Sequence, residues 1–204
     1  MTATKTFQTL GQRSKWRVVD IVVASVIGVA MGLVFFGWDQ IYLPASAPLT
    51  AALPGTQSLL WGVWLIPAVL GGLIIRKPGA AIFVEIVAAS VEALTYWGWG
   101  IGTIEAGFVQ GLAVELVLLA FLYANWRVHV AVLAGAAAGL AMGINDLIIS
   151  YPGSAPAFAV TYAISAIISG AVIAGLGSWL LARAIARTGV LARFASGRDA
   201  VAPV

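Results

Sequence analysis

Long apolar stretches make up most of the chain, and short polar or proline- and glycine-containing segments separate them. A hydrocarbon core of about 30 Å requires roughly 20 helical residues. Six stretches reach or approach that length: Val18–Phe36, Leu59–Ile75, Ala80–Leu94, Glu105–Ala124, Val128–Ile149 and Ala157–Leu181. They are longer than barrel strands and do not alternate between apolar and polar residues. The pattern predicts an all-α integral membrane protein, a bundle of six transmembrane helices.

The composition supports a membrane protein and excludes several other classes. Of the 204 residues, 61% are hydrophobic and 9% are charged, whereas soluble domains carry about 25% charged residues. Cytosolic enzymes, nucleic-acid-binding proteins and disordered chains are therefore excluded. The chain has no cysteine and one histidine, His129, and no H-E-x-x-H or G-x-S-x-G motif. We expect neither an enzyme nor a bound metal or cofactor.

Basic residues predict how the helices are oriented. All eleven lie before the first stretch, between the second and third, between the fourth and fifth, or after the sixth. With six spans these segments share one side, so the positive-inside rule places both termini in the cytoplasm. We expect a cytoplasmic segment 1–17, a membrane domain 18–183 and a cytoplasmic tail 184–204.

Carboxylates inside the expected spans lack basic partners. Glu85 and Glu92 lie about 12 and 22 Å along their helix from Lys77, two turns apart on one face. An ionised group at this depth is costly, so each needs a reason. One reason is structural, because a protonated or hydrogen-bonded acid can hold helices together. Asp20, Asp39 and Glu105 have simpler explanations as an ion-paired, a loop and a first-turn residue.

The second explanation for these acids is a ligand cavity. Polar groups and aromatic residues near the outer ends of the helices would suit a polar, cationic ligand that stacks on aromatic rings. The tryptophans have an alternative role as an interfacial belt, and Trp99 is assigned to it. The candidate ligand-binding residues are Glu85, Glu92, Gln110, Glu115, Asn145, Asp146, Trp61, Trp64 and Tyr162.

The segment Trp38–Ser58 is long for a connection and contains Pro44, Pro48 and Pro54. It is expected on the external side, where a ligand would arrive. We predict a loop that acts as a lid over the cavity, with Trp38 and Tyr42 among its contacts.

Several short stretches, in this order, resemble one transporter family. They are Trp16-Arg17-Val18-Val19-Asp20, Trp64-Leu65-Ile66-Pro67, Gly71-Gly72, Arg76-Lys77-Pro78-Gly79-Ala80, Phe83-Val84-Glu85, Glu92, Gln110-Gly111 and Glu115-Leu116. The chain resembles the substrate-binding S components of energy-coupling-factor (ECF) vitamin transporters, and in particular the YkoE family, implicated in uptake of thiamine or its hydroxymethylpyrimidine precursor. The resemblance implies capture of such a vitamin and docking onto a membrane T component driven by two ATPases. The chain contains no phosphate-binding loop, so partners would have to hydrolyse ATP.

In S components the first helix contacts the T component through small residues spaced four apart. Ala24, Gly28 and Gly32 match that spacing, and the resemblance assigns them to docking. Small residues at this spacing also serve ordinary helix packing.

A proton-coupled secondary transporter that uses Glu85, Glu92 and Glu115 as a proton relay is the alternative function. It would explain acids without bases, although the inverted repeats typical of such transporters are not apparent.

Overall fold

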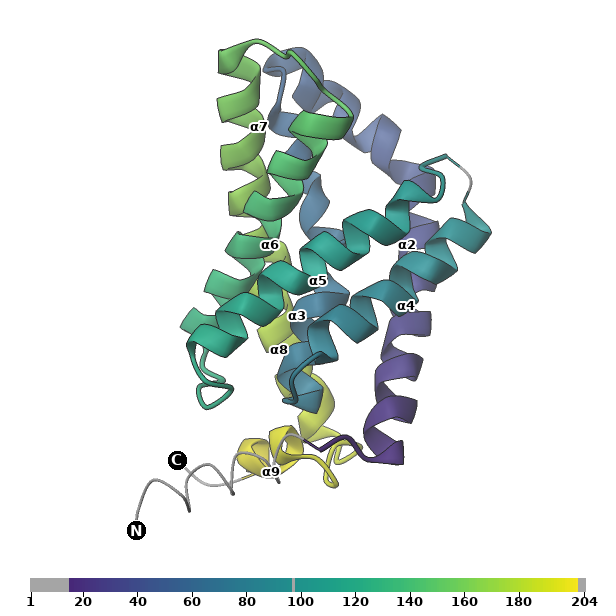
Figure 1. Cartoon of the computed structure of the whole chain (residues 1–204), viewed down its shortest axis with the longest axis vertical. Helices are drawn as coiled ribbons and strands as arrows, with labels where there is room; N and C mark the ends of the chain where they lie inside the picture. Colours follow the sequence, from purple (N-terminus) through teal and green to yellow (C-terminus); the bar gives the residue numbers. More distant parts are fainter. Residues whose placement is uncertain (1–14, 97, 202–204) are drawn as a thin grey trace.

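The computed structural model describes residues 15–96 and 98–201, and these residues form helices and connections without a β-strand (Figure 1). Most of the expected N-terminal segment 1–17 lies outside this part. In chain order the elements are α2 (Val18–Ala52), the 3₁₀ helix η1 (Thr56–Val63), α3 (Ile66–Ile75), α4 (Ala80–Thr95), α5 (Gly102–Ala120), α6 (Val128–Ile149), α7 (Pro156–Ser169), the π-helical η2 (Gly170–Leu176), α8 (Gly177–Arg187) and α9 (Ala195–Val201).

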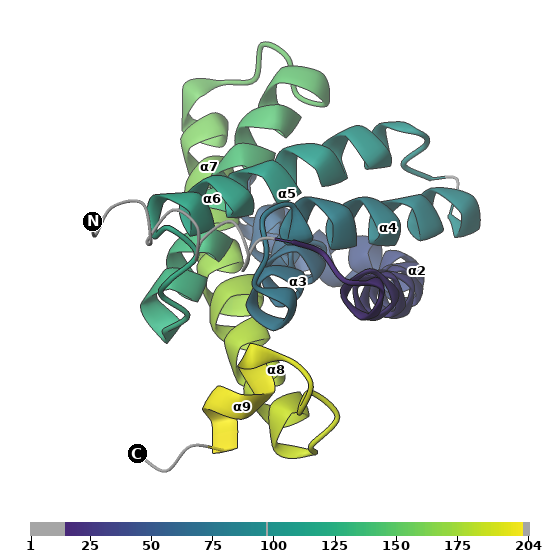
Figure 2. The same cartoon turned by 60° about the horizontal axis from the view of Figure 1, so that its bottom comes forward.

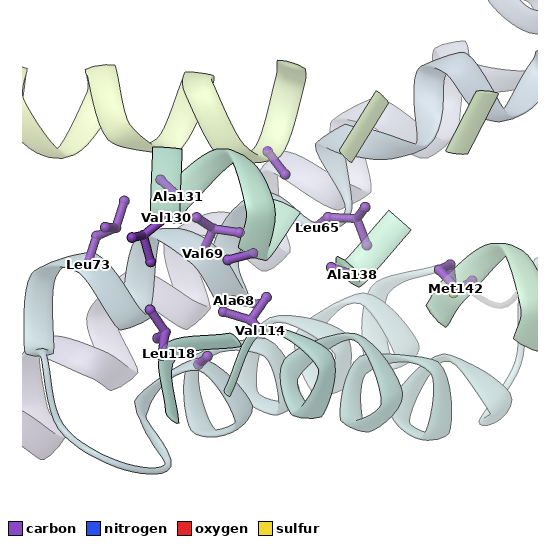
Figure 3. Packing of buried hydrophobic residues seen from close by; sticks show 13 residues of the cluster. Leu65, Ala68, Val69, Leu73, Val114, Leu118, Val130, Ala131, Ala138 and Met142 are labelled. Carbon is purple, nitrogen blue, oxygen red and sulfur yellow. The ribbon is translucent and has the colours of Figure 1, made fainter. Parts of the chain in front are cut away.

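Helix α3 is the central element of the bundle (Figure 1). Nine of its ten residues are buried, as expected for a short helix that is apolar on every side. It packs against α4, α5, α8 and η2. Figure 3 shows Leu65, Ala68, Val69 and Leu73 of this region against side chains of α5 and α6.

Five segments are long and apolar enough to cross a membrane: α2, η1 with α3, α5, α6, and the continuous run α7–η2–α8. The remaining expected span, Ala80–Leu94, corresponds to α4, which has only 16 residues. Helix α4 carries Glu85 and Glu92 and packs between α2 and α5. The all-helical membrane fold is thus confirmed, and α4 falls short of a span by length.

Helix α2 contradicts the expected loop. It continues through the segment 38–52 and has Pro44 and Pro48 inside it. Proline lacks a backbone N–H and leaves one helix carbonyl without its usual partner, and membrane helices tolerate it because neighbouring helices and Ser or Thr side chains satisfy the freed groups. The 35-residue helix is about 52 Å long, more than the hydrocarbon core requires. Its second half leans across the top of the molecule towards α7 (Figure 1).

The small-residue stripe of α2 faces α4. Ala24, Gly28 and Gly32 are all buried. A methyl group added to Gly28 would lie 2.6 Å from the Val87 Cβ, and one added to Gly32 would lie 2.5 Å from the Val91 Cβ. Close packing inside this chain therefore covers the face that was expected to dock a T component, and this prediction is corrected.

The α3–α4 connection lies beside the start of α2. It contains two residues with left-handed backbone, Arg76 (φ 57°) and Gly79 (φ 84°). Lys77 Nζ lies 2.6 Å from Asp20 Oδ2, and Arg17 Nη2 lies 2.8 Å from Asp20 Oδ1. The expected ion pair of Arg17 and Asp20 is therefore present, with Arg17 exposed and Asp20 buried. Lys77 adds a second pair, so this cluster around Asp20 joins the start of α2 to the α3–α4 connection.

Candidate functional site

A cavity of about 430 Å³ lies among the second half of α2, η1, α4, α5 and α6. Most predicted ligand-binding residues line it: Trp61, Trp64, Glu85, Glu92, Gln110, Asn145 and Asp146. Its volume falls in the range typical of small-molecule sites. The structure therefore brings together in one space residues that are up to 85 positions apart in the sequence.

Four aromatic side chains form one wall of the cavity. The ring centroids of Tyr42 and Trp64 are 4.9 Å apart, those of Trp61 and Trp64 are 5.6 Å apart, and those of Trp64 and Trp99 are 6.2 Å apart. The Trp61 indole N–H donates to the Tyr42 hydroxyl at 2.7 Å. These edge-to-face and tilted contacts orient the rings and leave an aromatic surface towards the cavity.

Glu85 and Glu92 lie on the cavity side of α4. Glu92 Oε1 accepts a hydrogen bond from the Trp64 indole at 2.8 Å. Glu85 Oε2 accepts one from the backbone N–H of Ala68 at 2.6 Å. With its nitrogen towards Glu85, the Gln110 amide donates to Glu85 Oε1 at 3.0 Å. Glu85 is nearly fully buried, so it belongs both to the cavity and to the packing around α3.

A second polar group lies on α5 and α6. Asn145 Nδ2 donates to Glu105 Oε2 at 3.2 Å, and the Tyr162 hydroxyl donates to Asp146 Oδ2. Tyr162 is fully buried and is not part of the cavity wall. Tyr162 therefore lies behind Asp146 and not in the cavity wall, where it was expected.

Glu115 does not line the cavity, which contradicts its predicted place. Its Oε1 accepts from the backbone N–H of Ala81 at 2.7 Å, at the start of α4. Its other oxygen accepts from the Tyr123 hydroxyl. Burial and the adjacent Glu115 carboxylate both raise the pKa of Tyr123. Glu115 thus completes a helix start, where a carboxylate is favoured by the helix dipole.

The two residues of the expected lid lie on α2. Tyr42 lines the cavity, together with Leu43, Ser46 and Thr50 of the same helix. Trp38 is not part of the wall, and its ring packs edge-on against Trp64 at 6.3 Å. A helix, and not a loop, therefore covers this side of the cavity.

For three residues of this region the sequence indicated roles other than ligand binding: an interfacial belt for Trp99, a helix first turn for Glu105 and a loop for Asp39. Trp99 and Glu105 line the cavity, and Asp39 is buried and accepts from the Trp99 indole at 2.9 Å. The spacing of Phe35, Asp39, Tyr42 and Ser46 could have indicated Asp39, because it continues the buried face of α2 beyond residue 36. The prolines obscured that continuity.

The cavity offers acceptors and aromatic surface. Four carboxylates line it, Glu85, Glu92, Glu105 and Asp146, and none of its described lining residues is lysine, arginine or histidine. In the part of the chain that the structure describes, no three acids, histidines or cysteines are grouped to hold a metal ion. The arrangement suits an organic ligand with a positive charge or amine donors and a planar ring.

Comparisons with known proteins agree with this architecture. Residues 19–141 match the family model of the permease component of ABC-type cobalt transport systems. The chain is 34% identical to YkoE of Bacillus subtilis (strain 168), a proposed HMP/thiamine permease, over 90% of this chain and 92% of that protein. A crystal structure of an S component of an ECF transporter is also 34% identical, with a TM-score of 0.82 over 91% of this chain and 93% of the other.

Proposed function

Because this chain belongs to the YkoE family of ECF transporter S components, we propose that it binds thiamine or its hydroxymethylpyrimidine precursor in the cavity between α2, α4, α5 and α6. The family makes it a multi-pass cell membrane protein and a vitamin-binding transport subunit, not an enzyme. The observation that carries the choice of ligand is the aromatic wall beside four carboxylates without a cation.

The chemistry of the ligand fits the two walls. Thiamine carries a cationic thiazolium ring and an aminopyrimidine, and the precursor carries the aminopyrimidine alone. Trp61, Trp64 and Trp99 provide faces for a planar or cationic ring. Glu92 and its neighbours accept from the amine and balance the positive charge. A precursor without the thiazolium would use the amine contacts only, so it is expected to bind more weakly.

Calorimetric titration of the purified chain with thiamine and with hydroxymethylpyrimidine tests this function. Glu92→Gln keeps an oxygen that can accept from the Trp64 indole but removes the charge. It should weaken binding by about 1–3 kcal/mol, roughly 5- to 150-fold in Kd.

Glu115→Gln is the matched control, because it changes a buried glutamate outside the cavity and should leave Kd within about twofold. Thermal unfolding of both variants checks that each is folded. Failure of the wild-type chain to bind either compound, or equal weakening in both variants, would overturn the assignment.

The proposal includes the membrane arrangement and the partners. We propose that α4 also crosses the membrane, which makes six crossings in all, and that the end carrying α9 faces the cytoplasm, as the basic residues predict. Uptake would require a T component and two ATPases. Since the stripe of Ala24, Gly28 and Gly32 is covered by α4, a partner would contact other surfaces. The alternative of a proton relay is not favoured, because the relatives are transporter subunits and Glu115 lies outside the cavity.

A further inference from the structure

A second cavity, of about 620 Å³, lies at the opposite end of α3 from the aromatic cavity. The α3 terminus, the α5–α6 connection, α8 and Ser196 of α9 surround it. Figure 2, with the bottom of the molecule forward, shows α3, α8 and α9 next to one another at this end. The proposed vitamin function makes no use of this cavity.

Three arginines line the cavity, Arg76, Arg127 and Arg183, and no aspartate or glutamate is among its described lining residues. Two of the guanidinium groups lie over indole rings. Arg76 is 5.1 Å from the Trp126 ring centroid, and Arg183 is 4.6 Å from that of Trp179. Stacking of this kind holds the Arg183 guanidinium plane and leaves its edge N–H groups for an oxyanion. Arg76 Nε donates to the Leu73 carbonyl at 3.1 Å, so Arg76 contributes positive charge beside the site.

Helix α6 starts at this cavity. Arg127 is its N-terminal cap residue, and the Arg127 side chain makes no capping hydrogen bond, while the Arg127 backbone N–H donates to Asn125 Oδ1 at 3.1 Å. The helix dipole therefore adds positive potential to that of the arginines. Arg127 and Arg183 are both exposed at this site, and no described carboxylate forms an ion pair with either of them.

The cavity is placed where lipid headgroups lie. Arg76 directly follows one candidate span, the connection 121–127 joins two others, and Arg183 is near the end of a fourth. Trp126 and Trp179 are half-buried, as is typical of residues at the membrane interface. Leu122 on the connection and Leu180 on α8 are exposed, and we expect them to contact acyl chains.

We propose that this cavity binds the phosphodiester headgroup of an anionic phospholipid. Arginine pairs with phosphate through parallel N–H donors, and basic pockets between membrane helices recognise such headgroups. A free phosphate would share the arginine contacts but has no acyl chains to contact the exposed leucines.

Native mass spectrometry of the delipidated full-length chain tests the proposal, with phosphatidylglycerol, phosphatidylcholine and inorganic phosphate as probes. The wild-type protein should bind one phosphatidylglycerol about tenfold more tightly than phosphatidylcholine, and millimolar inorganic phosphate should not displace it. The double variant Arg127→Gln/Arg183→Gln should lose about tenfold or more in phosphatidylglycerol affinity.

The double variant Arg187→Gln/Arg193→Gln is the matched control. It removes the same charge from exposed positions at this end that do not line the cavity, and it should bind phosphatidylglycerol like the wild type. Thiamine binding serves as the check that both double variants are folded. If the wild-type chain does not bind thiamine, an unchanged thermal unfolding midpoint serves as that check.

An equal loss of phosphatidylglycerol affinity in the two double variants would show that the overall positive charge of this end attracts the lipid. That result would overturn the proposed site. So would a lack of preference for phosphatidylglycerol over phosphatidylcholine, or its displacement by inorganic phosphate. Unchanged lipid binding in Arg127→Gln/Arg183→Gln together with loss of T-component assembly would identify a protein interface instead.

Discussion

Glutamates from neighbouring helices satisfy backbone donors at two helix starts inside the bundle. Glu85 accepts from Ala68, the third residue of α3, and Glu115 accepts from Ala81, the second residue of α4. The first N–H groups of a helix have no partner within it, and leaving one unsatisfied away from water is costly. These hydrogen bonds therefore give Glu85 and Glu115 a structural reason to be present in an apolar chain, independent of any ligand.

Removing the Glu115 carboxylate should destabilise the protein. We expect Glu115→Ala to lower the free energy of unfolding by about 1–3 kcal/mol, because it orphans the Ala81 N–H and the Tyr123 hydroxyl. Thermal unfolding of the purified protein would measure this as a lower midpoint. Tyr123→Phe removes one of the two partners and should have a smaller effect. Loss of vitamin affinity in Glu115→Ala at an unchanged unfolding midpoint would contradict the capping role.

Among the elements, α2 shows most clearly how spacing and neighbours act together. Its buried residues recur every three or four positions from Asp20 to Ser46, which keeps one face against the bundle across both prolines. The lower part of that face consists of small residues that permit close approach to α4, and the upper part carries Phe35, Asp39 and Tyr42 beside the cavity. One helix thus joins the packing of the bundle to the ligand site.

Substituting Gly28 should separate α2 from α4. A leucine there would meet Val87, since even a methyl group would lie 2.6 Å from the Val87 Cβ. Overpacking of this kind costs about 1–3 kcal/mol. We expect Gly28→Leu to lower the thermal unfolding midpoint and, by shifting α4 with its glutamates, to weaken vitamin binding.

Gly37→Leu is the matched control on the same helix. Gly37 is exposed and a Cβ there would have no neighbour within 4 Å. This substitution should leave the midpoint unchanged or raise it, because leucine has the higher helix propensity. Wild-type stability of Gly28→Leu together with a specific loss of T-component binding would restore the docking role of the stripe.

At the scale of the whole molecule, the two ends differ in chemistry. One end holds the aromatic and acidic cavity, and the other holds the arginine-lined cavity, the Asp20 cluster and α9. This asymmetry agrees with the expectation that the basic end faces the cytoplasm. It also places the vitamin site and the proposed lipid site at opposite ends of α3, so their binding can be measured independently.

Cysteine labelling of cells can test the orientation, since the native chain contains no cysteine. Ala155 precedes α7 at one end, Ala192 lies between α8 and α9 at the other, and both are exposed. A membrane-impermeant maleimide should label Ala155→Cys in intact cells and Ala192→Cys only after permeabilisation. The reverse pattern would invert the proposed topology, and labelling of both in intact cells would contradict a membrane crossing by the run α7–η2–α8.

The sequence by itself determined that the chain is a helical membrane protein, and it identified three of the four carboxylates of the cavity, Glu85, Glu92 and Asp146. Hydropathy is a local property, so long apolar stretches and the isolated acids within them can be recognised without knowledge of the fold. The ordered short stretches around Trp64, Glu85 and Gln110 also indicated the family.

Only the tertiary structure decided which of these residues meet. In lipid both the packed face and the exposed face of a helix are apolar, so periodicity does not show which neighbour a face contacts. For that reason Gly28 could not be assigned to α4, or Glu115 to the start of α4, from spacing alone. The proline-containing part of α2 was mistaken for a loop for a related reason. The same residues that end a helix in water are tolerated in a membrane helix, because neighbouring helices and Ser or Thr side chains can satisfy the backbone groups that proline frees.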